Sequence, residues 1–119
     1  ALPAQMRATK LQKRAANYGF DWPDAEGVID KVKEELAELQ QEVDSGDKTR
    51  QEEELGDLMF ACVNLARHLS IDPERALAKT NNKFVRRFES MDAELDLKNN
   101  ETYTADTLEQ AWIKAKQAE

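Results

Sequence analysis

Apolar residues recur along most of the chain at intervals of three or four, the period of an amphipathic α-helix. In residues 24–43, for example, apolar side chains fall at positions 28, 32, 36, 39 and 43. This period, together with helix-start and helix-stop residues, predicts five helices. Their expected ranges are about 3–18, 24–43, 49–69, 72–97 and 105–118. No segment alternates as a β-strand does, so an all-α fold is expected.

The third predicted helix is apolar around more than half of its circumference. One arc carries Leu55, Leu58, Met59, Cys62, Leu65, Ala66 and Leu69, and Phe60 and Val63 widen it. A helix of this kind is buried on several sides, in a bundle or across a subunit interface. An antiparallel bundle of about five helices is therefore expected, with Cys62 in its core.

Length and composition agree with one helical domain over residues 1–119. The chain has only 4 Gly and 3 Pro, and its single cysteine rules out an intramolecular disulfide. No apolar run approaches the roughly 20 residues that cross a bilayer, and no signal peptide is recognisable. We therefore expect a cytoplasmic domain without a membrane partner. Because the sequence opens with Ala1, we expect it to be cut from a longer protein.

The negative charge is concentrated in one stretch. The chain carries a net charge of −7, but residues 21–57 alone hold 14 acidic and 4 basic side chains. Such a balance argues against a nucleic-acid partner. It fits either a solvated acidic face or a divalent cation that carries a phosphate group.

Two acidic motifs fall on consecutive predicted helices. Glu34, Glu35 and Glu38 lie on the second helix, and Glu54 and Asp57 lie on the third. Residues three apart share a helix face, and the short connection at residues 44–48 favours an antiparallel pair in which the two faces meet. Two carboxylates about 6 Å apart repel by roughly 3 kcal/mol at an effective dielectric constant near 20. Such a group selects a hard cation, Mg²⁺ or Mn²⁺, although each motif alone is also common on solvated helices.

Other metal sites do not fit the sequence. The segment after Asp44 lacks the glycine and the glutamate of an EF-hand loop, and the lone histidine, His68, has no glutamate three residues before it. His68 is expected instead to interact with a helix C-terminus.

Cationic and aromatic residues of the last two helices could serve a phosphate ligand. Lys83 and Arg87 are one turn apart, and Trp112 shares a face with Lys116. Asn81 interrupts an apolar stripe, where a buried amide would need partners. A core tryptophan and a solvated lysine would also fit the sequence.

The combined motifs resemble the second, catalytic domain of the MazG family of all-α nucleoside triphosphate pyrophosphohydrolases. The resemblance covers nearly the whole chain. It rests on the acidic motifs and on the segments Lys10–Arg14, Asn17–Trp22, Asn64–His68, Asn81–Phe88 and Trp112–Lys116. Many relatives carry two copies of the signature and this chain carries one, so the resemblance implies an isolated C-terminal domain.

The resemblance implies Mg²⁺-dependent hydrolysis of nucleoside triphosphates between the α and β phosphates, with broad base preference. It implies that the metal is held by Glu35, Glu38, Glu54 and Asp57, with Glu34 supporting the site or orienting the water. It further implies that Lys83, Arg87 and Lys116 neutralise the triphosphate, that Asn81 and Trp112 line the pocket, and that a homodimer completes the core. A narrower relative acting on dUTP or phosphoribosyl-ATP, or a non-catalytic acidic interaction module, is the alternative.

Overall fold

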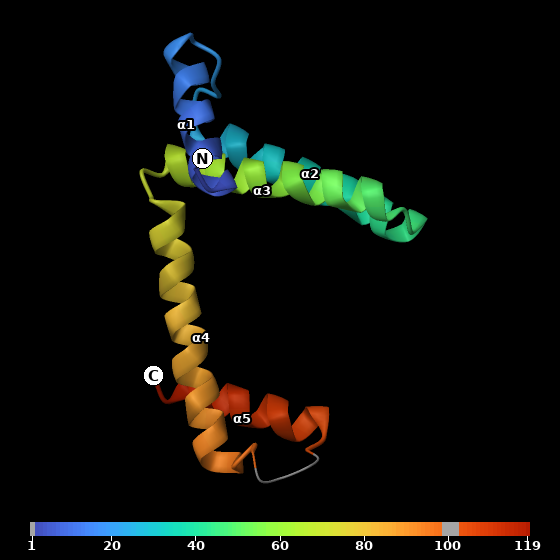
Figure 1. The fold of residues 1–119 in the computed structure, drawn as a ribbon, viewed down its shortest axis with the longest axis vertical. Coiled ribbons are helices and arrows are strands. Elements are labelled where there is room, and N and C mark those ends of the chain that lie inside the picture. The colour runs from blue at the N-terminus through green and yellow to red at the C-terminus, as the bar shows by residue number, and fades with distance from the viewer. Residues whose placement is uncertain (1, 99–102) are drawn as a thin grey trace. The chain divides into compact units, whose positions relative to one another are not determined.

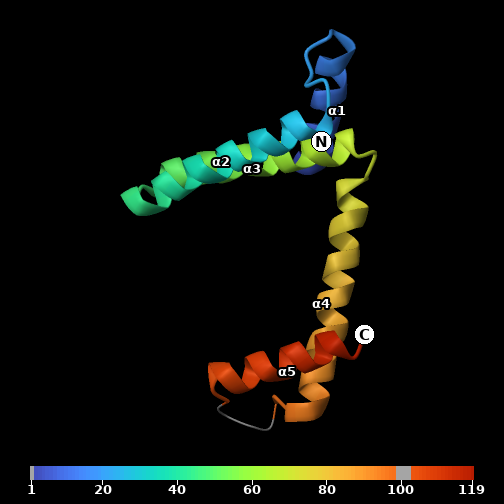
Figure 2. The same ribbon diagram turned by 180° about the vertical axis from the view of Figure 1, so that it is seen from behind.

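The computed structural model describes residues 2–98 and 103–119 (Figures 1 and 2). Within these residues the chain forms five α-helices and no strand, which confirms the expected all-α class. The helices are α1 (Ala4–Asn17), α2 (Ala25–Ser45), α3 (Lys48–His68), α4 (Pro73–Leu95) and α5 (Ala105–Gln117). They belong to two compact units, Ala1–Ala76 and Leu77–Glu119. None of the described helices combines the length and the apolar composition needed to span a bilayer.

Local capping residues account for the helix boundaries. Asp24 accepts a hydrogen bond from the Gly27 amide at 2.9 Å and so begins α2, and Asp72 accepts one from the Glu74 amide beside the start of α4. Gly19 follows α1 with a φ of 87°, in the left-handed conformation expected there. The helix expected to reach residue 97 ends at Leu95. Asp96, with a φ of 53°, turns the chain out of the helix.

Helices α2 and α3 form an antiparallel hairpin, which places the two acidic motifs side by side (Figures 1 and 2). The turn between them is short because Gly46 adopts a φ of 75°, and Asp47 caps α3 by accepting a hydrogen bond from Arg50. Val28 of α2 is fully buried, and Ala61 and Val63 of α3 are also buried. The antiparallel pairing predicted from the short connection is confirmed.

Helix α1 packs against α3 through an unusual buried contact. The Gln12 side chain is 6% exposed and its Nε2 donates a hydrogen bond to the Phe60 carbonyl oxygen at 2.9 Å. This contact fixes the middle of α1 against the middle of α3.

The second unit has its own small core, formed between the later part of α4 and α5. Met91 of α4 and Ala111 and Ala115 of α5 are buried, and Leu95, Leu108 and Trp112 pack around them. Small residues on α5 let the two helices approach closely.

Cys62 is exposed, which corrects the expectation that it lies in the core. Phe60 and Met59 on the same helix are also 46% and 57% exposed. In a single chain α1 and α2 cover only part of the wide apolar arc of α3, so these side chains remain uncovered. Completion of the core by a second copy stays a prediction.

The loop between α1 and α2 is fastened to the end of α3 by Asp21. Its Oδ1 accepts hydrogen bonds from Arg67 Nη2 at 2.6 Å and from the Trp22 amide at 2.8 Å, and lies 2.8 Å from His68 Nε2. Asn64, which is buried, accepts two further hydrogen bonds from Arg67. His68 does lie in the last turn of its helix, but its partner here is this carboxylate. Chiefly through the hydrogen bond from Arg67, the pKa of Asp21 is lowered from 3.8 to about 2.

We expect Asp21→Asn to lower the free energy of unfolding at pH 7 by about 1 kcal/mol, because it removes charge-assisted hydrogen bonds. The lowered pKa means that the ionised carboxylate stabilises the fold above pH 3.8 and that this contribution is lost as the pH falls through about 2. Urea unfolding at several pH values should therefore show the two proteins converging below pH 4. Asp30→Asn, the same change at an exposed aspartate of α2, is the control and should show no such convergence. A constant difference down to pH 2 would contradict the role of the Asp21 charge.

Candidate metal centre

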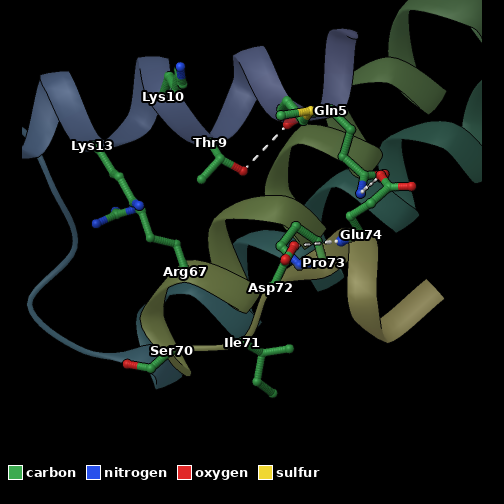
Figure 3. Close-up of a pocket in the computed structure, with 11 residues that line it drawn as sticks. Gln5, Thr9, Lys10, Lys13, Arg67, Ser70, Ile71, Asp72, Pro73 and Glu74 are labelled. Atoms are coloured by element: carbon green, nitrogen blue, oxygen red, sulfur yellow. Dashed lines mark hydrogen bonds between the residues drawn. The ribbon is translucent and has the colours of Figure 1, made fainter. Parts of the chain in front are cut away.

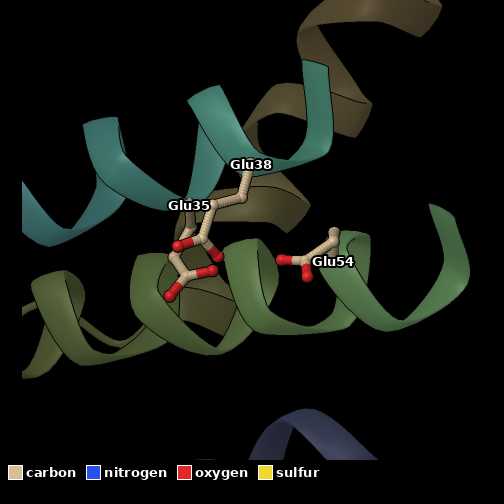
Figure 4. Close-up of side chains that lie close together, drawn as sticks. All are labelled: Glu35, Glu38 and Glu54. Atoms are coloured by element: carbon tan, nitrogen blue, oxygen red, sulfur yellow. The ribbon is translucent and has the colours of Figure 1, made fainter. Parts of the chain in front are cut away.

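Three glutamates from two helices meet on the facing sides of the hairpin. Glu35 and Glu38 extend from α2 and Glu54 extends from α3, and one carboxylate oxygen of each lies within 4.8 Å of the others (Figure 4). The three-residue spacing on α2 brings its two side chains to one face, and the hairpin register supplies the third. The expected convergence of acidic side chains from both helices is therefore observed. We call these three residues the glutamate cluster.

Two oxygens of the glutamate cluster are buried without a hydrogen-bond partner. They are Oε2 of Glu35, a residue that is only 6% exposed, and Oε2 of Glu54. A buried carboxylate oxygen that lacks a partner costs free energy, which a bound cation would recover. An all-oxygen donor set of this kind fits a hard divalent cation, so the residues present suit a metal site.

The electrostatics of the cluster favour a cation for the same reason. Repulsion from Glu35 raises the pKa of the Glu38 carboxyl, and burial and a hydrogen bond with Glu54 act in the same direction. Like charges held this close resist simultaneous ionisation unless positive charge is nearby.

Lys31 supplies part of that positive charge, and the sequence interpretation missed it. Its Nζ lies 3.1 Å from Glu35 Oε1 and 3.6 Å from Glu34 Oε1. The hydrogen bond with Glu35 is the main cause of the raised pKa of Lys31. The signal that could have revealed it is its position one turn before both glutamates on the same helix.

The remaining predicted acidic residues lie differently. Glu34 is largely exposed, with its carboxylate turned to Lys31. Asp57 is exposed on α3 and does not belong to the glutamate cluster. Its side chain is one carbon shorter than that of Glu54, which limits its reach. The role of Asp57 as a metal ligand stays a prediction.

In the second unit the structure brings together two of the five predicted substrate residues. The Arg87 guanidinium lies 5.7 Å from the centre of the Trp112 ring, and its Nε donates a hydrogen bond to Glu119 at 3.1 Å. Phe84 also contacts Trp112, with ring centres 5.4 Å apart. The pairing of Arg87 with Glu119 was not predicted, because Glu119 lies beyond the end of α5, where helical periodicity no longer applies.

The structure does not group the other three predicted substrate residues with Arg87 and Trp112. Lys83 is half-buried and Lys116 is exposed. Asn81 is exposed as well, which corrects the expectation that it lies in a buried stripe. Its neighbours in that stripe, Leu77 and Phe84, are 50% and 55% exposed, so the stripe is not covered at this point of α4.

Another cluster of polar side chains lines a cavity in the first unit. A cavity of about 560 Å³ lies between α1 and the start of α4, lined by Lys10, Lys13, Arg67, Asp72 and Glu74 among others (Figure 3). Both cationic and acidic side chains line it, and Gln5 donates a hydrogen bond to Glu74. Its mixed charge selects no ligand class.

Comparison with known proteins identifies the family. The MazG nucleotide pyrophosphohydrolase domain matches residues 24–91, more than half of the chain, and this segment includes the whole glutamate cluster. The chain belongs to the MazG family. The family inferred from the sequence motifs is thereby confirmed.

Two curated relatives extend the match over the remaining residues. A nucleoside triphosphate pyrophosphohydrolase of Escherichia coli strain K12 is 46% identical over 123 aligned positions, which cover 100% of this chain and 47% of the relative. The nucleoside triphosphate pyrophosphohydrolase/pyrophosphatase MazG of Thermotoga maritima is 45% identical over 118 positions, which cover 97% of this chain and 45% of that protein. The chain therefore spans about half the length of these curated relatives.

If the glutamate cluster is under electrostatic strain without a cation, Glu38→Gln should raise the midpoint of thermal unfolding in EDTA, because it removes one charge from the group. Helical content, measured by circular dichroism, should stay the same. Glu26→Gln, at an exposed position of α2, is the matched control and should not raise the midpoint. A lower midpoint or a loss of helicity in Glu38→Gln would show that Glu38 stabilises the fold instead.

Proposed function

We propose that this MazG-family chain hydrolyses nucleoside triphosphates between the α and β phosphates and releases a nucleoside monophosphate and pyrophosphate. The observation that supports this most directly is the glutamate cluster, with its two buried and unpartnered oxygens. The names of the relatives from Escherichia coli and Thermotoga maritima describe the same reaction class. Because such triphosphates are cytoplasmic metabolites, the proposal places the chain in the cytoplasm.

The acidic residues take defined roles in this proposal. Glu35, Glu38 and Glu54 would hold Mg²⁺, or Mn²⁺ in its place, and Asp57 would complete the donor set. When bound, the ion supplies Lewis-acid polarisation of the phosphate and a lowered pKa for the attacking water. Glu34, exposed at the edge of the cluster, would orient that water by accepting a hydrogen bond from it.

Residues of the second unit would bind the rest of the substrate. Lys83, Arg87 and Lys116 would neutralise the triphosphate, and Asn81 and Trp112 would line the pocket. Arg87 is already placed against Trp112, but it would have to exchange the carboxylate of Glu119 for a phosphate oxygen. The proposal takes residues 1–119 as a single MazG domain.

A homodimer is part of the proposal because α3 presents apolar side chains, Met59 and Phe60 among them, that are exposed within the described residues. A cavity of about 500 Å³ lies along α3, lined mostly by apolar groups, including those of Met59, Phe60 and Cys62. The buried apolar residues of the first unit are few and small, Val28, Ala61 and Val63. A second copy seated on this face would enlarge the core that a unit of this size lacks.

Product analysis tests the reaction. With Mg²⁺ and a panel of nucleoside triphosphates, we expect pyrophosphate and monophosphate in equal amounts, and Glu38→Ala and Asp57→Ala should reduce turnover by about 100-fold or more while helicity is retained. Asp30→Asn should keep wild-type activity. Release of orthophosphate would contradict the proposed bond cleavage. Turnover of only dUTP or phosphoribosyl-ATP would show the narrower specificity, and an inactive but dimeric protein would favour an interaction module.

Sedimentation tests the dimer. Phe60→Asp should shift the wild-type dimer toward monomer by at least about tenfold in dissociation constant, because it places a charge in an apolar interface. Phe20→Asp, which introduces the same charge at an aromatic residue 79% exposed on a loop, should leave the dimer intact. A monomeric wild-type protein at micromolar concentration would contradict the proposal.

A further inference from the structure

The proposed reaction assigns no role to Lys31, which lies beside the glutamate cluster. It lies on α2 one turn before Glu35, and the two side chains form an ion pair of 3.1 Å in which the Glu35 side chain is 8% exposed. Among the described residues, Lys31 is the cation found within ion-pair distance of the glutamate cluster. The Lys31 side chain is 35% exposed, so its ammonium group can move away from the Glu35 carboxylate into solvent.

The ion pair divides the Glu35 carboxylate into two different oxygens. Oε1 is held by Lys31, whereas Oε2 is buried without a partner. The ammonium group therefore neutralises one carboxylate of the cluster while it leaves a second oxygen free for another ligand. Counted by formal charge, three carboxylates and one ammonium leave about −2, which one divalent cation would neutralise.

We propose that Lys31 is a built-in counter-ion that lowers the affinity of the glutamate cluster for divalent cations. This inference rests on the proposed function, because it takes the cluster as the metal site. Lys31 pairs with Glu35 before a cation arrives, and it then opposes the cation, either by repulsion across the cluster or by competing for Glu35 Oε1. Its role is to set the affinity and to position Glu35.

The same charge at a neighbouring position provides a matched control. Lys33 is an exposed lysine on the same helix, two residues further on. It lies on a different side of α2 from Lys31, because successive helical residues are about 100° apart. Removing the Lys33 charge changes the net charge of the protein as much as removing the Lys31 charge does. It leaves the ion pair between Lys31 and Glu35 in place.

The test is a titration of the full chain with Mn²⁺ alone, in 0.15 M salt and without nucleotide, with free Mn²⁺ measured by electron paramagnetic resonance. We expect Lys31→Met to bind Mn²⁺ about tenfold more tightly than the wild type. Lys33→Met, and Lys31→Arg, which keeps the charge, should stay within about twofold of the wild type. Circular dichroism checks that each variant is folded, and Lys31→Gln replaces Lys31→Met if the latter does not fold.

The outcomes separate this inference from the proposed function. If the wild type binds Mn²⁺ and Glu38→Gln weakens it, but Lys31→Met binds as the wild type or more weakly, the counter-ion role is overturned while the metal site stands. If Lys33→Met gains as much affinity as Lys31→Met, the effect is one of net charge and the specific role is likewise overturned. If the wild type binds no Mn²⁺, the proposed function itself fails.

Discussion

Electrostatic repulsion within the glutamate cluster is the constraint on which the rest of the first unit depends. Carboxylate oxygens from Glu35, Glu38 and Glu54 are held within 4.8 Å of one another, although like charges at that distance oppose folding. The hairpin tolerates this repulsion because other contacts hold its helices in register. Asp24 and Asp47 cap the helices, and α1 packs across α3. We therefore expect the cluster to lower stability locally and the other contacts to offset this loss, as is common for functional sites.

Much of this arrangement could be predicted from the sequence because it follows from local rules. Helical periodicity and the residues Asp24, Gly46 and Pro73 act within a few positions of themselves, so they predict the helices and most of their ends. The meeting of Glu35 and Glu38 with Glu54 also follows from local geometry, since a short turn forces two helices to be antiparallel. Asp57 shares the face of Glu54 but is exposed and lies outside the glutamate cluster, so its role as a ligand stays a prediction.

The features that were missed depend on distant or competing contacts. Asp21 meets Arg67 and His68 across 46 and 47 positions, and no periodic pattern links a loop residue to the end of a helix that distant. For Lys31, spacing alone allows a pair with Glu34 or with Glu35. The structure places it nearer the buried Glu35, where an ion pair is less screened by water.

The exposure of Asn81 has a simple geometric cause. Helix α5 crosses the later part of α4 and does not run along its length (Figures 1 and 2), so it covers only that part. Its contacts lie around Met91, near the end of α4, and the earlier turns keep an apolar stripe that is half-exposed. A periodic stripe predicts which face of a helix is apolar, but the direction in which the partner helix crosses it decides how much of that face is buried.

Two sides of helix α3 carry different kinds of side chain. One side carries Glu54 toward α2, and another carries Met59 and Phe60, which are exposed within the described residues. These two sides need opposite partners, because a carboxylate oxygen is stabilised by positive charge and an exposed aromatic ring by removal from water. A single chain satisfies neither fully. In the proposed enzyme the two requirements would be met by different components, a cation and a second copy of the chain, both acting on the same helix. Assembly at the apolar side would then hold α3 more rigidly, and a rigid α3 keeps Glu54 at a fixed distance from Glu35 and Glu38, which is the geometry that binding a small hard cation demands.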